Sequence, residues 1–450
     1  MLRRSWLSTD KGILILLILS LLAFLLLFKP WIHGTDPTGY YSWLRSVVVD
    51  GDLDTADEYA HLGQGHVGST TTTGHRDNPY AIGSAILWAP FFLVAHGLTL
   101  GGQALGFPLT SDGYSPQYIV AISLGSVAYA FTGLLLVYYT AREFFTFSIV
   151  TLAVASVWLA SPLVFYQYSH PAMSHANDAF AYALFLFAWH KTRGRRTLVQ
   201  YILLGAVTGL AALVRTQNGL LVLFPVIEIA IDSARRYRKG EGKKAILSGA
   251  VGAFAFSLAW WLAFLPQMAV WRTVFGEWWP GNPYTRTGGG AFDFSHPYIL
   301  EVLFSTNHGL FVWTPLMLPA VLGWFPLWQR DRRLTALLAL NLALQLYVVA
   351  SWSSWDGSAA FGQRFFTNMV PAFALGLAAL LNTMQSRIPL RWLVMACGFF
   401  VAWNGLLLIR YVLGDVPRFG GIPLEQLILG QFTIIPRYLG RIVQVLITRE

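Results

Sequence analysis

The sequence consists mainly of apolar runs of helical length, separated by short basic clusters. The runs fall near residues 12–28, 81–100, 117–139, 147–165, 179–190, 198–214, 218–231, 246–265, 309–327, 334–350, 365–381 and 392–412. A helix needs roughly 20 mainly apolar residues to cross a bilayer. Only 12% of the 450 residues are charged, whereas a soluble domain carries about 25%. The sequence therefore predicts an all-α, polytopic membrane protein.

Composition also excludes several classes of protein. The formal charge of +9 is divided among short clusters between the apolar runs, which indicates membrane topology and not a nucleic-acid-binding patch. The single cysteine, Cys397, excludes a disulfide framework and a zinc motif. The first run, Gly12 to Phe28, follows basic residues as a signal peptide would. No small-residue cleavage site follows it and further apolar runs do, so we interpret it as a retained anchor.

The basic clusters predict which loops lie inside the cell. They occur at Arg3, Arg4 and Lys11, at Lys191, Arg193, Arg195 and Arg196, at Arg235 to Lys244, at Arg330, Arg332 and Arg333, and at Arg387 and Arg391. All of them fall on the cytoplasmic side only if the 81–100 run does not cross. We therefore expect 81–100 to be a helix in the outer interface or packed against the bundle. The prediction is eleven spans, with the N-terminus inside and the C-terminus outside.

This topology predicts one bundle with its loops on the outer face. Residues 1–412 form the transmembrane part, and residues 413–450 form a short outer segment. The predicted outer loops are residues 29–116, 166–178, 266–308 and 351–364, whereas the inner loops are short and basic. We expect an integral protein of the cytoplasmic (inner) membrane whose chemistry, if any, takes place outside.

The first outer loop begins with an aspartate that has two interpretations. Asp36 stands at an expected helix N-cap and Pro37 at the first helical position. Residues at helical spacing follow and predict an amphipathic surface helix: Tyr40, Leu44, Val47 and Val48. Asp36 either caps this helix or acts as a general base at the water–lipid boundary, and one residue can do both. Tyr40 is a candidate substrate contact.

The second outer loop, "YQYSHPAMSHAND" (166–178), contains two histidines and an aspartate. Polar groups at membrane depth usually face a cavity, which makes His170, His175 and Asp178 candidates for substrate binding. The alternative is that they are hydrogen-bonded loop and cap residues. A zinc site would need more ligands than this stretch supplies.

Two further loops supply the remaining candidates. In "SWSSWDGSAAFGQR" (351–364), Arg364 is the only basic residue; it either binds phosphate through its fork of donors or extends to the interface. Asp356 precedes it. In the 266–308 loop, Arg286 and His308 accompany many aromatic residues, and Gly288 to Gly290 predict a mobile loop. We interpret this segment as a lid or substrate-binding loop.

Together these stretches resemble the GT-C glycosyltransferases, specifically bacterial membrane proteins related to the family 39 protein mannosyltransferases and lipid A aminoarabinose transferases. The resemblance extends over nearly the whole chain. It rests on "TDPTGYYSWLRSVVVDGDLDTADEY", "NPYAIGSAILWAPFFLVAH", "HPAMSHANDAF", "LVRTQNGLLVLFP", "LFSTNHGLFVWTPLM" and "WSSWDGSAAFGQRFF".

The resemblance implies a GT-C-like bundle of about eleven transmembrane helices with surface helices on its outer face. It implies a hexosyl or pentosyl transferase that uses a polyprenyl-phosphate sugar and inverts the anomeric centre, with Asp36 as base. The acceptor could be a lipid, a protein or a glycan. Better-known members often carry an Asp-Glu pair where this chain has Asp36 and Pro37, so a divalent metal stays open.

Two alternative functions remain open at this point. A polysaccharide ligase or polymerase would use similar substrates but would rely on outer-loop arginines and histidines. A flippase or transporter of lipid-linked sugars would show polar residues at mid-span and broken helices repeated in two halves. Few charges lie at mid-span and no such repeat is evident, which favours the transferase.

Overall fold

The computed structural model describes residues 10–194, 196–286 and 290–448, so the expectations for Arg3, Arg4, Arg195, Gly288 and Gly289 lie outside the described residues. Within these ranges the chain is almost entirely helical, with two isolated β-bridges and no strand. The α-helices are α1 (Lys11–Leu27), α2 (Thr35–Arg45), α3 (Ala56–His61), α4 (Gly83–Ala104), α5 (Pro116–Ala141), α6 (Phe147–Leu159), α7 (His175–Thr192), α8 (Leu198–Val214), α9 (Leu223–Arg236), α10 (Lys243–Phe275), α11 (Pro283–Arg286), α12 (Ile299–Phe304), α13 (Leu310–Trp313), α14 (Met317–Leu322), α15 (Trp324–Arg330), α16 (Arg332–Ala350), α17 (Val370–Met384), α18 (Leu390–Val412) and α19 (Leu424–Thr448). Short π- or 3₁₀-helical segments are η1 (Ser46–Asp50), η2 (Phe165–Ser169), η3 (Thr216–Val222), η4 (Tyr237–Glu241) and η5 (Arg364–Met369).

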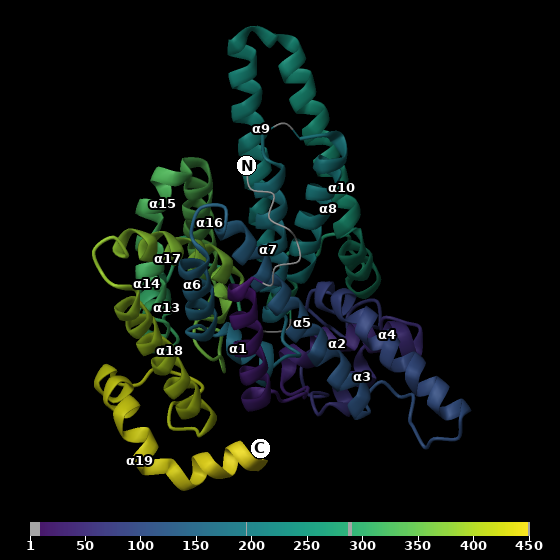
Figure 1. Cartoon of the computed structure of the whole chain (residues 1–450). Coiled ribbons are helices and arrows are strands. Elements are labelled where there is room, and N and C mark those ends of the chain that lie inside the picture. The colour runs from purple at the N-terminus through teal and green to yellow at the C-terminus, as the bar shows by residue number, and fades with distance from the viewer. Residues whose placement is uncertain (1–9, 195, 287–289, 449–450) are drawn as a thin grey trace.

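The long helices form a bundle whose two ends differ. The α9–α10 hairpin extends from one end, whereas α2, α3 and α19 lie at the other (Figure 1). Buried Glu228 of α9 pairs with Arg196 and, at 3.3 Å, with Arg333. Arg193 pairs with Asp331. Clusters far apart in the sequence therefore meet at the hairpin end, as helices that cross alternately require.

The helices support an integral membrane protein. Seven are long and apolar enough to cross a membrane by length and composition: 83–104, 116–141, 216–241, 243–275, 332–350, 364–384 and 390–412. Three shorter apolar helices, α1, α6 and α8, accompany them. These lengths confirm a polytopic, all-α architecture, but they do not by themselves fix the predicted eleven spans.

Small residues let the helices pack closely. Gly205 and Gly209 lie one turn apart on α8, and a Cβ on either would overlap a backbone carbonyl of α10. Such spacing of small residues is a common helix-packing device in membranes. The turn before α8 is closed by a capping box in which Thr197 and Gln200 exchange side-chain-to-backbone hydrogen bonds.

The 309–327 run, which we expected to be one span, is three short helices. α13 ends at Trp313 and α14 begins at Met317, and Pro315 lies in the break between them. Proline lacks a backbone N–H and disfavours a helical residue before it, which explains the interruption. The break between α14 and α15 falls at Gly323, whose backbone packs directly against Gly376 of α17.

The helix α4 runs obliquely beside α2 and α5 (Figure 1). Its first residue, Gly83, touches the backbone of Val214 at the end of α8. Near its other end, Thr99 accepts a 3.4 Å hydrogen bond from Gln117 at the start of α5. Gly113, which follows α4, accepts a hydrogen bond from Tyr41 of α2. Both ends of α4 thus adjoin the same end of the bundle, which is the geometry expected of a helix that does not cross.

The segment 413–450 contains a long helix that our sequence analysis did not identify. α19 is docked by Arg410, a buried residue of α18 that donates to the carbonyls of Leu427 (2.6 Å) and Gln426 (3.1 Å). Gly430 allows this contact because a side chain there would overlap the guanidinium of Arg410.

Candidate functional site

The helix α2 places Asp36 differently from our expectation. The N-cap is Gly34, at φ 89°, and Asp36 lies within the first turn, so the prediction that Asp36 caps the helix is wrong. Its carboxylate points instead toward residues from other elements. Pro37 to Arg45 are all buried, so α2 is not an amphipathic surface helix either. The segment before α4 covers it: Asn78 donates a 3.0 Å hydrogen bond to the carbonyl of Gly39, and Tyr80 packs directly against that glycine.

Two strong contacts hold the Asp36 carboxylate. Tyr80 donates its hydroxyl to one oxygen at 2.7 Å, and Arg364 donates to the other oxygen at 2.6 Å. Burial alone would raise the pKa of Asp36, but the Arg364 charge and the two hydrogen bonds outweigh it and lower that pKa below its ordinary value. About 28% of the side chain stays exposed. Asp36 is therefore an ionised carboxylate that keeps free lone pairs toward the pocket.

Aromatic rings form one wall beside Asp36. Tyr40 packs edge-on against Tyr80 at 5.0 Å between ring centroids, and Tyr284 packs against Tyr80 at 5.5 Å. Tyr284 comes from α11 in the 266–308 loop, so that loop contributes to the site. Arg286, the residue we predicted from this loop, lies outside the pocket, where it pairs with Glu277 at 3.2 Å.

The loop before η5 holds Arg364 in place. Gly357 (φ 74°) lies against the Arg364 side chain, and a Cβ there would be strained and only 3.0 Å from the Arg364 Nε. Asp356 forms this turn: it accepts from Asn307 at 2.9 Å and from the Ser358 N–H at 3.0 Å. His308 is fully buried beneath the turn, 2.9 Å from the Asp356 carbonyl. Asp356 and His308 therefore support Arg364, and neither lines the pocket.

A second arginine, which our sequence analysis did not single out, lies close by. Arg215 directly follows the last residue of α8. Its guanidinium lies 5.5 Å from the ring of Phe365, and the guanidinium of Arg364 lies at the same distance from that ring. Arg215 contacts His175 at 3.2 Å and Asp178 at 3.5 Å, and both of these residues are buried in α7. His175 and Asp178 thus position Arg215. The sequence did contain a signal for Arg215: an arginine at the outer end of a predicted span departs from the positive-inside pattern.

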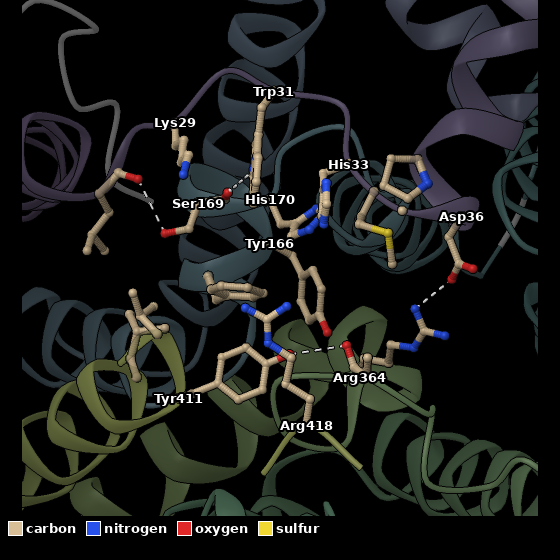
Figure 2. A pocket seen from close by; sticks show the side chains of 18 of the residues that line it. Lys29, Trp31, His33, Asp36, Tyr166, Ser169, His170, Arg364, Tyr411 and Arg418 are labelled. Carbon is tan, nitrogen blue, oxygen red and sulfur yellow. Dashed lines mark hydrogen bonds and ion pairs between the residues drawn. The ribbon is translucent and has the colours of Figure 1, made fainter. Parts of the chain in front are cut away.

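A pocket of about 560 Å³ opens in front of the Asp36–Arg364 pair, between α1, η2 and α18 (Figure 2). His170 lines it, and burial lowers the pKa of this histidine to about 4, so it is neutral at physiological pH. The Trp31 ring packs against the rings of both His33 and His170, with centroids 4.9 Å and 5.2 Å away. Of the predicted residues, the structure brings Asp36, His170 and Arg364 into this pocket.

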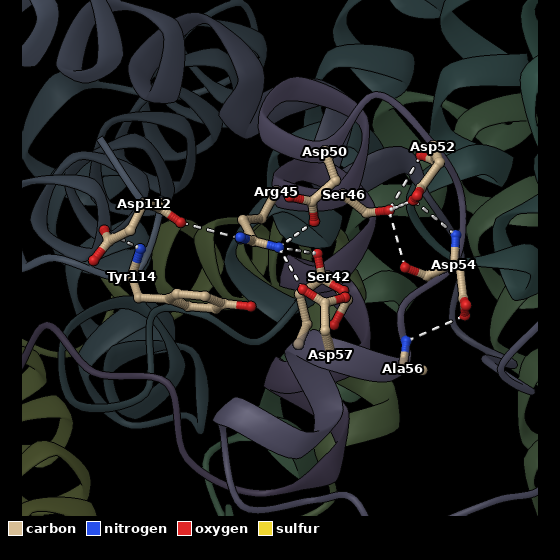
Figure 3. A network of polar contacts seen from close by, with 12 residues as sticks. Ser42, Arg45, Ser46, Asp50, Asp52, Asp54, Ala56, Asp57, Asp112 and Tyr114 are labelled. Carbon is tan, nitrogen blue, oxygen red and sulfur yellow. Dashed lines mark hydrogen bonds and ion pairs between the residues drawn. The ribbon is translucent and has the colours of Figure 1, made fainter. Parts of the chain in front are cut away.

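Three other acids of the first loop form a separate cluster around Arg45 (Figure 3). Arg45 pairs with Asp50, with Asp57 at 2.7 Å and with Glu58 at 3.2 Å. Among the described residues, only Asp50, Asp57 and Glu58 bring three atoms that could bind a metal ion, one from each side chain, within 4.8 Å of one another. Since the Arg45 guanidinium already contacts all three, the cluster is a structural clamp within the loop. Burial raises the pKa of Glu58 to about 9.

Part of the sequence matches a known protein family. Residues 116–261 match the family described as dolichyl-phosphate-mannose-protein mannosyltransferase, which is less than half of the chain. The sequence matches none of the curated proteins.

Two solved structures are similar over almost the whole chain. ArnT from Cupriavidus metallidurans in the apo state is 14% identical, with a TM-score of 0.53 over 98% of this chain and 72% of that chain. The archaeal oligosaccharyltransferase AglB from Archaeoglobus fulgidus, in complex with an inhibitory peptide and a dolichol-phosphate, is 13% identical, with a TM-score of 0.52 over 93% of this chain. The match spans 57% of the AglB chain. The resemblance found in the sequence is therefore confirmed at the level of the fold: this chain shares the fold of the ArnT and AglB structures.

Proposed function

We propose that this protein is a membrane glycosyltransferase that moves a sugar from a polyprenyl-phosphate donor to an acceptor hydroxyl, with Asp36 as the base. The observation that carries the proposal is an ionised aspartate held by Tyr80 and Arg364 at the edge of a pocket between membrane helices. The fold supports it, because the matched family is named for a dolichyl-phosphate-mannose donor and the AglB structure contains a dolichol-phosphate.

The chemistry is a single displacement. The acceptor oxygen attacks the anomeric carbon, the bond from that carbon to the phosphate oxygen breaks, and the acceptor proton passes to Asp36. The configuration at the anomeric carbon is inverted. Each Asp36 oxygen accepts one hydrogen bond here and has capacity for another, so the carboxylate can receive the acceptor hydroxyl without losing its contacts.

The leaving group is a polyprenyl phosphate, whose negative charge grows as the bond breaks. Arg364 and Arg215 flank Phe365 and supply positive charge next to Asp36. Preorganised cations of this kind stabilise charge that develops in a transition state. A phosphate is already a good leaving group, which explains how a site with one identified carboxylate can suffice.

The test uses purified protein, a panel of radiolabelled polyprenyl-phosphate hexoses and pentoses, and membrane extract as the source of acceptor. Asp36→Asn is compared with wild type and with Glu425→Gln, which removes an exposed carboxylate from the start of α19. Asparagine keeps the size of the side chain and can still accept from Tyr80. We expect transfer from one donor, a loss of about 10²–10⁴-fold in Asp36→Asn, and no change in the control.

Three results would contradict this proposal in different ways. Transfer that Asp36→Asn retains would move the base elsewhere. Movement of intact lipid-linked sugar across vesicles, without transfer, would indicate a flippase. Polymerisation of lipid-linked glycans would indicate a ligase or polymerase.

A further inference from the structure

The pocket contains more positive charge than the Asp36–Arg364 pair uses. Its lining includes three permanent cations, Lys29, Arg364 and Arg418, and one acid, Asp36. Arg364 is paired with Asp36. The side chains of Lys29 and Arg418 form no hydrogen bond or ion pair with any other described residue. Each lies against an aromatic ring instead: Lys29 lies 4.1 Å from Trp31 and Arg418 lies 5.8 Å from Tyr411. Two cations therefore face the pocket without an anion.

The structure holds Arg418 in this position although it lies on a connector. Residues 413–423 join α18 to α19, and Arg410 fixes both sides of this segment. It pairs with Asp415 at 2.7 Å and donates to the carbonyl of Leu427 at 2.6 Å. The N–H of Asp415 in turn donates to the Arg410 carbonyl at 2.9 Å. A buried arginine thus organises the segment that presents Arg418.

Part of the pocket lining is apolar and exposed. Leu26 of α1 is 66% exposed, Val412 of α18 is 42% exposed, and Phe419 is 68% exposed. All three line the pocket. Both α1 and α18 are apolar helices whose outward residues face lipid if they cross the membrane. A ligand that enters here would bring an apolar chain along α1 and α18 and an anionic group to Arg418 and Lys29.

A second cavity of about 370 Å³ lies between α8, η3 and α10. Its lining is mainly apolar and aromatic, with Trp260, Trp261 and Trp279, and it contains no charged residue. A phosphate placed there would lack a counter-ion, and an unpaired charge in an apolar site is costly. The charge distribution therefore favours the pocket with Arg418 for the phosphate end of a lipid.

We propose that Arg418 and Lys29 bind the phosphate of the polyprenyl carrier as it enters laterally between α1 and α18, on its path to Asp36 and Arg364. The proposal rests on the proposed function and adds a binding site and a route to it. Arginine suits this task because its planar fork can hold two phosphate oxygens, whereas Lys29 supplies a point charge. His170 also lines this pocket and, being neutral, adds no charge that would compete with either arginine.

The first experiment measures binding of sugar-free polyprenyl phosphate to the purified full chain in phosphatidylcholine nanodiscs. Arg418→Ala and Lys29→Ala are compared with Arg387→Ala, which removes an exposed arginine between α17 and α18, outside the pocket lining. We expect about a ten-fold rise in Kd for Arg418→Ala, a smaller rise for Arg418→Lys, and none for Arg387→Ala. An unchanged Kd in Arg418→Ala would overturn the proposal.

A second arm separates the carrier from ordinary lipid. Phosphatidylglycerol replaces part of the phosphatidylcholine in the nanodiscs. We expect carrier binding to persist at equal amounts of the two lipids. Displacement by phosphatidylglycerol in proportion to its amount would assign the two cations to bulk anionic headgroups and overturn the proposal.

A photoreactive carrier then locates the chain. We expect crosslinks to α1 and to residues 408–419; crosslinks confined to α8 and α10 would overturn the route. Failure of the proposed function is distinguishable from failure of this inference. Carrier binding that depends on Arg418, without any sugar transfer, would support the site and contradict the enzyme. Transfer that depends on Asp36, with an unchanged KM for the donor in Arg418→Ala, would do the opposite.

Discussion

At the scale of residues, the balance between burial and Arg364 decides how Asp36 can act. Burial raises the pKa of this carboxyl, and the Arg364 charge is the largest influence that lowers it. Together with Tyr80, Arg364 keeps the carboxylate ionised at the edge of an apolar pocket. A base that must accept a proton late in the reaction benefits from this state, because it is already charged when the acceptor arrives.

Replacing Arg364 by alanine should therefore change the pH dependence of activity as well as its size. Without the guanidinium, burial dominates, the pKa of Asp36 rises, and the carboxyl is protonated over a wider pH range. We expect the acid limb of kcat/KM to move to higher pH and the maximum to fall roughly a hundred-fold. Arg364→Lys retains the charge and should leave the acid limb almost in place. An acid limb that stays fixed in Arg364→Ala would show that Asp36 is not the titrating base.

Our sequence analysis predicted which residues belong to the site better than it predicted which residues they contact. Asp36, His170 and Arg364 stood out because polar residues beside apolar runs are rare and costly. The hydrogen bond from Arg364 to Asp36 joins residues that are 328 positions apart, so no local sequence pattern predicts it. Tyr80, which donates to the same carboxylate, looks like one aromatic residue among many. Asp178 and His308 were predicted to bind substrate, but they are buried behind Arg215 and Arg364.

At the scale of elements, the first loop depends on a clamp that should respond to pH. Arg45 faces the carboxyl groups of Asp50, Asp57 and Glu58, and Glu58 is fully buried. Burial raises its pKa from 4.5 to about 9. A group whose pKa is raised by folding stabilises the protein below its unfolded pKa, and this contribution is lost as pH rises through the folded value. Glu58 should therefore weaken the fold progressively between pH 4.5 and about 9.

Glu58→Gln removes this titration and can be compared with wild type by thermal unfolding in detergent. We expect the Tm of the variant minus that of wild type to grow from pH 5 to pH 9, because glutamine stays neutral. Glu425→Gln, an exposed carboxylate with no partner among the described residues, should show no such trend. A constant difference across this pH range would mean that Glu58 is ionised in the folded protein.

A second prediction concerns the packing of α14 and α15 on α17. A Cβ at Gly376 would overlap the Ala320 carbonyl, and the break at Gly323 sits directly on the Gly376 backbone. We expect Gly376→Ala to destabilise the protein by about 1–3 kcal/mol, as overpacking does. Gly398 of α18 has no neighbouring atom within 4 Å of such a methyl group, so Gly398→Ala is the matched control. Equal Tm values for the two variants would argue against this close packing.

Helix positions in this chain were predictable where tertiary contacts did not intervene. The runs that became α1, α5, α16 and α18 match their helices closely, because a continuous apolar run leaves the backbone few alternatives in lipid. The 246–265 run is an exception: α10 continues to Phe275, so the predicted outer loop 266–308 begins too early. The 309–327 run failed because its prolines and Gly323 outweigh its hydropathy. α19 was missed because its apolar residues are interrupted by polar ones and its docking depends on Arg410, a residue of another helix.

At the scale of the whole molecule, the fold separates two ends with different chemistry. The hairpin end gathers basic clusters and their ion pairs, and the other end carries Asp36, the pocket and α19. In an alternating bundle, every helix that crosses must connect these ends. The helix α4 departs from this pattern, because it has 22 residues, enough for about 33 Å, yet both its ends adjoin the pocket end, as the predicted topology requires.

Single cysteines placed in a Cys397→Ser background should reveal this arrangement in intact cells. Thr72 lies before α4, Leu105 directly after it and Lys239 in the hairpin, and all three are exposed. We expect a membrane-impermeant maleimide to label Thr72→Cys and Leu105→Cys from outside and Lys239→Cys only after permeabilisation. All three should react in detergent, which controls for local burial. Leu105→Cys behaving like Lys239→Cys would show that α4 crosses. In that case the chain would re-enter the bundle from the opposite side and the basic clusters could not share one face. The prediction that Asp36 faces outward would then lose its topological basis.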